Sequence, residues 1–208
     1  MVEQQRPQSR VRPGRALLAM RRACPAPSRR GFTLTEIMAV LTVVALLLLV
    51  GVPNLREMIL RHQLRVTANA MLAAINLTRA QAVARGQRVI MTPADPRQAD
   101  WASGWRVFVD RNASLGFDAG DELIFERGPV ERGMRVSSAF ASPLAPFYIA
   151  YNSAGRSCGA SNSMAARPGG VSLALGRGTR HIKINMLGRA RICDPQTQAH
   201  DCEGAAND

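Results

Sequence analysis

An apolar segment near the amino terminus constrains this chain more than any other feature. From Phe32 to Val52 the sequence runs for twenty-one residues, and Glu36 is the only ionisable side chain among them. A helix rises about 1.5 Å per residue, so such a segment spans about 30 Å, the thickness of a bilayer's hydrocarbon core. An unpaired carboxylate at membrane depth costs up to about 2.5–3.5 kcal/mol. The segment therefore predicts a transmembrane helix whose glutamate has a partner.

The residues that precede the apolar run form a recognisable processing motif. Gly31-Phe32-Thr33-Leu34-Thr35-Glu36 follows a basic stretch and resembles the processing site of type IV pilins and pseudopilins. The resemblance implies that prepilin peptidase cuts between Gly31 and Phe32 and that the new amino terminus is methylated. It also implies that Glu36 pairs with the amine of a neighbouring subunit during fibre assembly. Thr35 departs mildly from the family, which usually has Ile or Val there.

A signal peptide and a plain membrane anchor account less well for the apolar run. A secretory signal peptide should end in a small-residue cleavage site, whereas this run ends in Val52-Pro53-Asn54-Leu55 and passes into more helix. A plain membrane anchor explains the length but leaves Gly31 and Glu36 without a role. The pilin-like processing site accounts for the length of the apolar run, for Gly31 and for Glu36.

The charge and the cysteines indicate the compartment. The resemblance implies that residues 1–31 are a leader that is cleaved and that 32–53 form an inner-membrane helix. Residues 1–31 carry eight arginines and one glutamate, and this positive charge predicts a cytoplasmic leader and export of everything that follows the helix. Three cysteines remain after the cut: Cys158, Cys193 and Cys202. In an oxidising periplasm we expect one disulfide and one odd thiol, with Cys193 bonded either to Cys158 or to Cys202. The sequence leaves this choice open.

The periodicity of the exported part predicts an α+β fold. Residues 54–86 continue the helix with an amphipathic pattern that Gly86 ends. Its apolar stripe is expected at Leu55, Ile59, Val66, Ala70, Ala73, Leu77, Ala80 and Ala84, broadened by Met71, Leu72 and Ile75. Residues 87–208 are expected to form antiparallel sheet that covers the helix. The strands are predicted at 89–92, 105–110, 122–125, 147–151, 171–175, 181–186 and 189–193, with Ile182, Ile184 and Met186 on one face.

This order of parts resembles the GspH/FimT family of minor pilins and minor pseudopilins. The resemblance rests on Thr78-Arg79-Ala80-Gln81-Ala82, on Gly104-Trp105-Arg106-Val107-Phe108-Val109-Asp110, and on Gly188-Arg189-Ala190-Arg191. It implies a type IV pilin-like fold, other pilins as partners, and a path from the inner membrane into a pilus at the cell surface.

Two short motifs admit a chemical interpretation and a plainer one. Gly155-Arg156-Ser157-Cys158-Gly159 matches the nucleophile elbow of hydrolases, but no helix is predicted after Ser157, so we expect no catalytic site and no cofactor. The loop 110–122 offers oxygen ligands at alternating positions, as calcium loops do. Its glycine lies one position later than in an EF-hand loop, and Arg111 lies inside the loop. A hairpin turn is therefore the favoured interpretation, and no metal is assigned.

The charges of the exported domain are strongly segregated along the chain. Residues 93–131 hold eight acidic and four basic side chains, whereas 132–193 hold nine basic side chains and no acidic one. A surface of one sign attracts polyanions, above all phosphate backbones. The Gly-Arg-x-Arg match resembles the DNA-binding motif of FimT-type minor pilins of competence. The candidate site for double-stranded DNA comprises Gly188, Arg189, Arg191, Lys183, Arg180 and Arg177.

The function expected from these features is capture of extracellular DNA by a minor pilin during natural transformation. Two further roles stay open at this point. One is a minor pilin that primes pilus assembly without touching DNA, and the other is the H-type minor pseudopilin of type II secretion.

Overall fold

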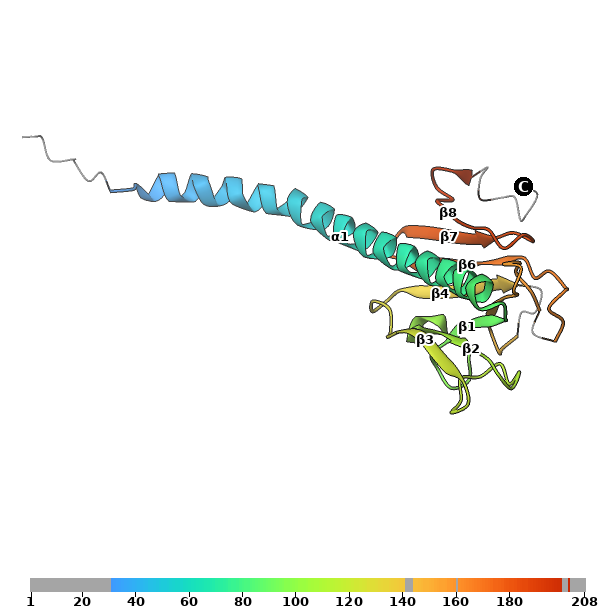
Figure 1. The fold of residues 1–208 in the computed structure, drawn as a ribbon. Helices are drawn as coiled ribbons and strands as arrows, with labels where there is room; N and C mark the ends of the chain where they lie inside the picture. Colours follow the sequence, from blue (N-terminus) through green and yellow to red (C-terminus); the bar gives the residue numbers. More distant parts are fainter. Residues whose placement is uncertain (1–30, 141–143, 160, 200–201, 203–208) are drawn as a thin grey trace, which may run out of the picture. The chain divides into compact units, whose positions relative to one another are not determined.

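The computed structural model describes residues 31–140, 144–159, 161–199 and 202. The predicted leader therefore lies outside the described residues, apart from Gly31. The described chain is α+β, with a long helix followed by strands in two antiparallel four-stranded sheets (Figure 1). The chain divides into two compact units, Met1–Ala45 and Leu46–Asp208, and all the packing described below lies within the second.

Helix α1 spans Leu34–Arg85 and starts and ends where the sequence predicts. The hydroxyl of Thr33 accepts a hydrogen bond from the backbone N–H of Glu36 at 3.2 Å, which caps the first turn. The helix continues through Pro53 and ends at Gly86, whose φ of +65° is the left-handed conformation of a helix C-cap. By length and composition this helix suffices to cross a membrane, and the described side chains of residues 34–49 are exposed.

The buried face of α1 coincides only in part with the predicted stripe. Leu55, Ile59 and Val66 are exposed, so the stripe was wrong at these positions, whereas Met71 and Ile75, which were expected to broaden it, are buried. The core face comprises Leu64, Thr67, Ala68, Met71, Ala74, Ile75, Thr78 and Ala82. Alanines occur all round this helix and fit either face, so counting apolar residues could not choose between them. The true face also contains threonines, and the Thr78 hydroxyl is satisfied within the helix because it donates to the Ala74 carbonyl at 2.7 Å.

The first sheet, sheet A, has the strand order β3-β2-β1-β5. Its strands are β1 (Val89–Pro93), β2 (Trp105–Val109), β3 (Glu122–Arg127) and β5 (Ile149–Tyr151), and the short 3-10 helix Trp101–Ser103 precedes β2. Strand β1 lies inside the sheet and all its residues are buried. The predicted strands are present within about two residues, as is usual for element ends.

The second sheet, sheet B, has the strand order β4-β6-β7-β8. Its strands are β4 (Arg135–Phe140), β6 (Gly169–Leu175), β7 (Gly178–Ile184) and β8 (Ala190–Cys193). Strand β4 was not predicted, because its inward positions include Ser138 and its apolar alternation is short. Met186 was placed on the apolar face with Ile184, but β7 ends before it and its side chain is exposed.

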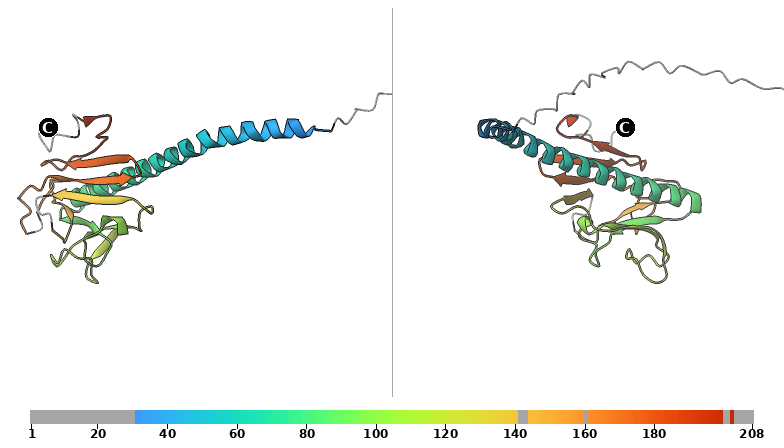
Figure 2. Two further views of the ribbon diagram at one scale, coloured as in Figure 1. Left: turned by 180° about the vertical axis from the view of Figure 1, so that it is seen from behind. Right: turned by 90° about the vertical axis from the view of Figure 1, so that its left-hand side faces the viewer.

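One face of sheet B packs against the helix and the other faces outward. Val171, Leu173, Ile182 and Ile184 join the helix residues in the main core. Figure 2 (left) looks onto the face that α1 does not cover. Side chains on that second face are therefore available to a partner.

A disulfide joins Cys193, the last residue of β8, to Cys202. Cys158 is a buried free thiol in a small cluster with Ile90, Phe108 and Ala150. The prediction of one disulfide and one odd thiol is confirmed. Of the two partners that the sequence allowed for Cys193, the structure has Cys202. The bond ties the segment after β8 back to sheet B.

The corrected helix face gives a direct test by paired substitutions. Met71→Ala should lower the free energy of unfolding by about 2–5 kcal/mol, because it opens a cavity in the core. Val66→Ala should change it by less than about 0.5 kcal/mol, because Val66 is exposed. Thermal unfolding of the detergent-solubilised protein, followed by the fluorescence of the buried Trp101 and Trp105, measures both changes. Equal losses in the two variants would show that Val66 is buried, as the sequence pattern predicted.

Candidate nucleic-acid interface

The segregation of charge along the sequence becomes a segregation between the two sheets. Strands β4, β6, β7 and β8 contain no aspartate or glutamate. Strand β3 alone contains Glu122 and Glu126, and the acidic loop 110–121 joins β2 to β3. Sheet B is thus the basic side of the domain.

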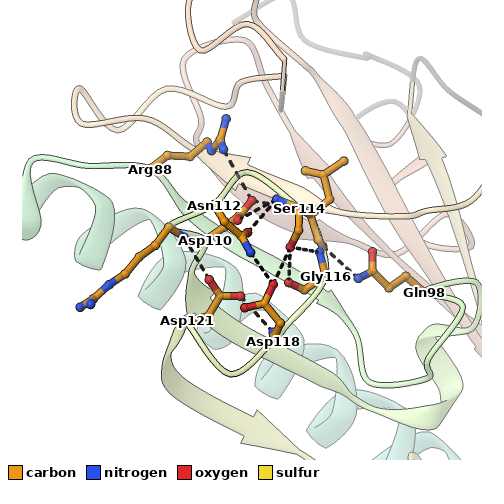
Figure 3. Close-up of polar contacts among 10 residues, drawn as sticks. Arg88, Gln98, Asp110, Asn112, Ser114, Gly116, Asp118 and Asp121 are labelled. Carbon is orange, nitrogen blue, oxygen red and sulfur yellow. Dashed lines mark hydrogen bonds and ion pairs between the residues drawn. The ribbon is translucent and has the colours of Figure 1, made fainter.

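The carboxylates of the acidic loop are occupied by contacts inside the loop (Figure 3). Asp110 accepts the backbone N–H groups of Ser114 at 3.1 Å and Leu115 at 3.2 Å, and its other neighbour is Arg88 at 3.5 Å. Asp118 accepts from Asn112 at 2.6 Å, and this bond is the main reason that the pKa of Asp118 is lowered. These are the local bonds of Asx turns and favour the hairpin interpretation.

Calcium gains no support from the geometry. Within the described residues, no group of three or more His, Cys, Asp or Glu side chains is placed to hold a metal ion. The glutamates that follow the loop are paired as well, Glu122 with Arg85 at 2.6 Å and Arg111 at 3.2 Å, and Glu126 with Arg106 at 2.7 Å. Three carboxylates of the acidic side, Asp110, Glu122 and Glu126, are therefore paired with arginines of the same chain.

The elbow-like serine has a structural role. Ser157 is buried, and its hydroxyl donates to the Arg167 carbonyl at 2.5 Å. The residue lies in an isolated bridge with Tyr151, not at a strand-to-helix turn. Asp194, the second member of the apparent triad, forms an ion pair with Arg180, and His200 lies outside the described residues.

The turn between β7 and β8 carries the Gly-Arg-x-Arg motif. The side-chain oxygen of Asn185 accepts the backbone N–H of Arg189 at 2.8 Å, and the N–H of Gly188 donates to the Asn185 carbonyl at 2.9 Å. Gly188 is buried with φ +79°, and a Cβ there would lie 2.5 Å from the Gly155 carbonyl oxygen and 2.8 Å from the Tyr151 ring. Only glycine fits this position.

The loop against which Gly188 packs is held by the helix. Arg79 of α1 donates from its Nε atom to the Gly155 carbonyl at 2.9 Å. Gly155 has φ +71°, and the side chains of Val83 and Arg79 leave no room for a Cβ on it. The helix motif 78–82 and the turn motif 188–191 thus meet on either side of one loop.

The six candidate residues do not form one cluster. Lys183 and Arg191 lie directly opposite each other on β7 and β8, and Arg189 precedes β8 in the adjoining turn. Arg189 and Arg191 are exposed and Lys183 is half-buried. The structure therefore brings together Lys183, Gly188, Arg189 and Arg191.

Arg180 and Arg177 are separated from that group. Arg180 forms an ion pair with Asp194. Arg177 lies in the β6–β7 turn, at the other end of β7, and at about 3.3 Å per residue the strand sets the two turns about 20 Å apart. Neither residue is placed to act on the same phosphates as the β7–β8 turn.

Three further arginines of the basic half have roles that the sequence did not indicate. Arg167 is buried, stacks on the Tyr148 ring at 3.8 Å and donates to the Tyr148 carbonyl at 2.8 Å, so it belongs to the fold. Arg156 is exposed and lies between Gly155 and Ser157, both of which contact Gly188. Arg135 is exposed on β4. No local pattern in the sequence separates these three arginines, because each comes from a different strand or loop.

His181 lies beside Lys183 on the outward face of β7. Its Nδ1 atom and the Ser172 hydroxyl share a hydrogen bond at 2.6 Å. Burial lowers the pKa of His181 below its usual value, and Lys183 lowers it further, against the opposing effect of Asp194. The imidazole is therefore neutral at neutral pH, and the cations of this face there are lysine and arginine.

The fold and the apolar amino-terminal helix define a type IV pilin-like subunit. The family described as Type II transport protein GspH matches residues 67–188, and the prokaryotic N-terminal methylation motif matches residues 27–52. The chain belongs to the GspH family, and it is a minor pilin or pseudopilin of a type IV pilus or of a type II secretion system. Membership implies assembly with other pilins and processing by prepilin peptidase.

A solved structure of low sequence identity shows the same fold. The type IV minor pilin FimU of Pseudomonas aeruginosa is 14% identical, with a TM-score of 0.51 over 66% of this chain and 92% of that one. The minor pseudopilin EpsH from the type 2 secretion system of Vibrio cholerae is 12% identical, with a TM-score of 0.44 over 64% of this chain and 98% of that one. No curated protein sequence matches the chain.

The contact at Gly188 predicts a steric effect on the turn. Gly188→Ala should lower the free energy of unfolding by about 1–3 kcal/mol, because the new Cβ meets backbone atoms in a left-handed conformation. Gly128→Ala is the control, since nothing lies within 4 Å of a Cβ there. Melting temperatures of the two variants measure the difference. A Gly188→Ala protein as stable as the control would show that the turn is not packed against the 155–157 loop.

Proposed function

We propose that this minor pilin captures extracellular double-stranded DNA for uptake in natural transformation, as FimT-type minor pilins do. Arg189 and Arg191 supply the main phosphate contacts, Lys183 adds a third, and Gly188 fixes the turn. Phosphate contacts carry no base information, so binding is largely independent of sequence.

The observation that carries this proposal is the absence of carboxylates from all four strands of sheet B. The glutamates on the strands of sheet A, Glu122 and Glu126, already form ion pairs with arginines on their own side of the domain. A basic surface beside a firmly held turn suits a partner that supplies negative charge. A phosphate backbone is such a partner.

A second candidate function is the minor pseudopilin of type II secretion, favoured by the description of the matching family. In that role, as in a minor pilin that only primes pilus assembly, the partners are proteins and DNA binding is not required. A binding assay with DNA separates both roles from the first proposal.

Processing is expected at the start of the apolar helix. Prepilin peptidase should cut between Gly31 and Phe32, and mass spectrometry of membrane-extracted protein should find a methylated Phe32 terminus. Glu36→Ala should leave membrane insertion intact and reduce recovery in sheared fibres, because only the pairing between subunits is lost. A mature terminus beyond Val52, or an uncut leader, would contradict the pilin processing.

The turn arginines predict a measurable salt dependence. Each phosphate contact contributes a slope of about −0.9 to log affinity against log salt, so Arg189→Ala/Arg191→Ala should flatten the slope by about 1.8. Both side chains are exposed and lie off the apolar face of Ala190 and Ile192, so the fold should be retained. Fluorescence anisotropy with a labelled duplex between about 50 and 200 mM salt makes the measurement.

The control removes the same charge from the other side of the domain. Arg97→Ala/Arg111→Ala deletes two exposed arginines from the loops of sheet A and should leave the slope close to wild type. Two results would overturn the proposal. One is unchanged binding by a folded turn variant, and the other is no binding by the wild-type protein at low salt.

A further inference from the structure

The outward face of sheet B has an unusual composition. The strand register places eleven residues there: Arg135, Ser137, Ala139, Gly170, Ser172, Ala174, Thr179, His181, Lys183, Arg191 and Cys193. Cys193 is buried and bonded to Cys202. Apart from three cations and one histidine, no side chain among them is larger than threonine. The face is therefore flat, carries three hydroxyl groups and has no carboxylate.

A hollow lies toward the end of this face that adjoins the β7–β8 turn. It has a volume of about 170 Å³ and is lined by Ala139, Gly170, Ser172, His181 and Lys183, together with neighbouring strand residues. The hollow exists because Gly170 has no side chain between Ala139 and Lys183, its partners across the strands. A Cβ on Gly170 would lie 2.6 Å from the Ile182 carbonyl oxygen. Glycine is thus required here by the sheet itself.

The polar groups around the hollow can receive an oxyanion. The stem of Lys183 extends towards Gly170, since its Cδ atom is 3.5 Å from the place of the missing Cβ. On the described residues, Lys183 has no ion pair with a carboxylate. The hydrogen-bonded pair of Ser172 and His181 stands on the next row of the same face.

We propose that the outward face of sheet B is a platform for the sugar-phosphate backbone of DNA, with one phosphate seated at the Gly170 hollow beside Lys183. This inference rests on the proposed function and extends the site from the β7–β8 turn across the sheet to Arg135. Arginine, lysine, serine and threonine are the side chains that contact phosphates in protein–DNA complexes. The small side chains between them allow a backbone to approach without steric obstruction.

The size of the platform suits this ligand. Four strands at about 4.8 Å spacing are about 14 Å across, which is the axial length of about four nucleotides of one DNA strand at 3.4 Å each. A second copy of the chain is a poorer occupant. The strand carboxylates of sheet A, Glu122 and Glu126, are already paired with arginines of their own chain.

A matched pair of substitutions tests the platform in the processed full chain in neutral detergent. Ala139→Glu places a carboxylate at the hollow, at an exposed position opposite Gly170. It should weaken binding to a labelled duplex and flatten the salt slope by about 0.9, the loss of one phosphate contact. Ala119→Glu makes the same change at an exposed position of the acidic loop and should leave the slope unchanged.

A second variant keeps the platform testable if Ala139→Glu does not fold. Arg135→Ala removes an exposed side chain from the far corner of the face and should lower the slope by up to about 0.9. Circular dichroism and tryptophan fluorescence confirm that each variant is folded.

The outcomes separate this inference from the proposed function. If the turn variant Arg189→Ala/Arg191→Ala loses binding while Ala139→Glu and Arg135→Ala bind as wild type, the platform is wrong and the site is confined to the turn. If the wild-type protein does not bind DNA at low salt, the proposed function itself fails. Loss in Ala139→Glu or Arg135→Ala, with Ala119→Glu unchanged, supports the platform.

Discussion

The burial of one face of α1 is the interaction on which the rest of the domain depends. Leu64, Met71 and Ile75 are almost completely buried, and each side chain contributes about 1.5–3 kcal/mol when removed from water. Sheet A supplies one part of the cover through residues such as Met91 and Val107, and sheet B supplies another through Leu173 and Ile182. Because sheet B uses its apolar positions on this side, its alternate positions must face outward. The alternation that places the apolar residues of sheet B in the core therefore also determines which residues form its outward face.

Local patterns predicted the elements whose determinants are local. Apolar length and a positive-φ glycine define α1, and period-two alternation defines β7, so both were recognisable in the sequence. The choice of helix face was not local, because it depends on which side chains the sheets can accept. Thr78 is a core residue because its hydroxyl is satisfied inside the helix. Strand β4 and the pairing of Cys193 with Cys202 depend on tertiary neighbours in the same way.

The candidate site likewise has a part that local sequence predicted and a part that depends on tertiary neighbours. Lys183, Arg189 and Arg191 lie on one hairpin, so sequence spacing was sufficient to group them. Arg180 looked similar in sequence, yet the following segment brings Asp194 to it. Arg167 looked like part of the basic surface, but stacking on Tyr148 and a bond to a carbonyl take it into the fold. The distribution of charge along the sequence identifies the basic half of the domain. Which of its cations face outward depends on their contacts in the folded structure.

The glycine and the arginines of the turn motif have different physical roles. The arginines contribute charge, whereas Gly188 allows the turn to pack against the Gly155 carbonyl, which Arg79 of α1 also binds. The turn is therefore fixed by the helix through one shared carbonyl group. A cation held on a fixed backbone loses less conformational freedom when it binds a phosphate than one on a mobile loop. The same constraint explains why the helix motif and the turn motif, about a hundred residues apart in sequence, belong to one structural unit.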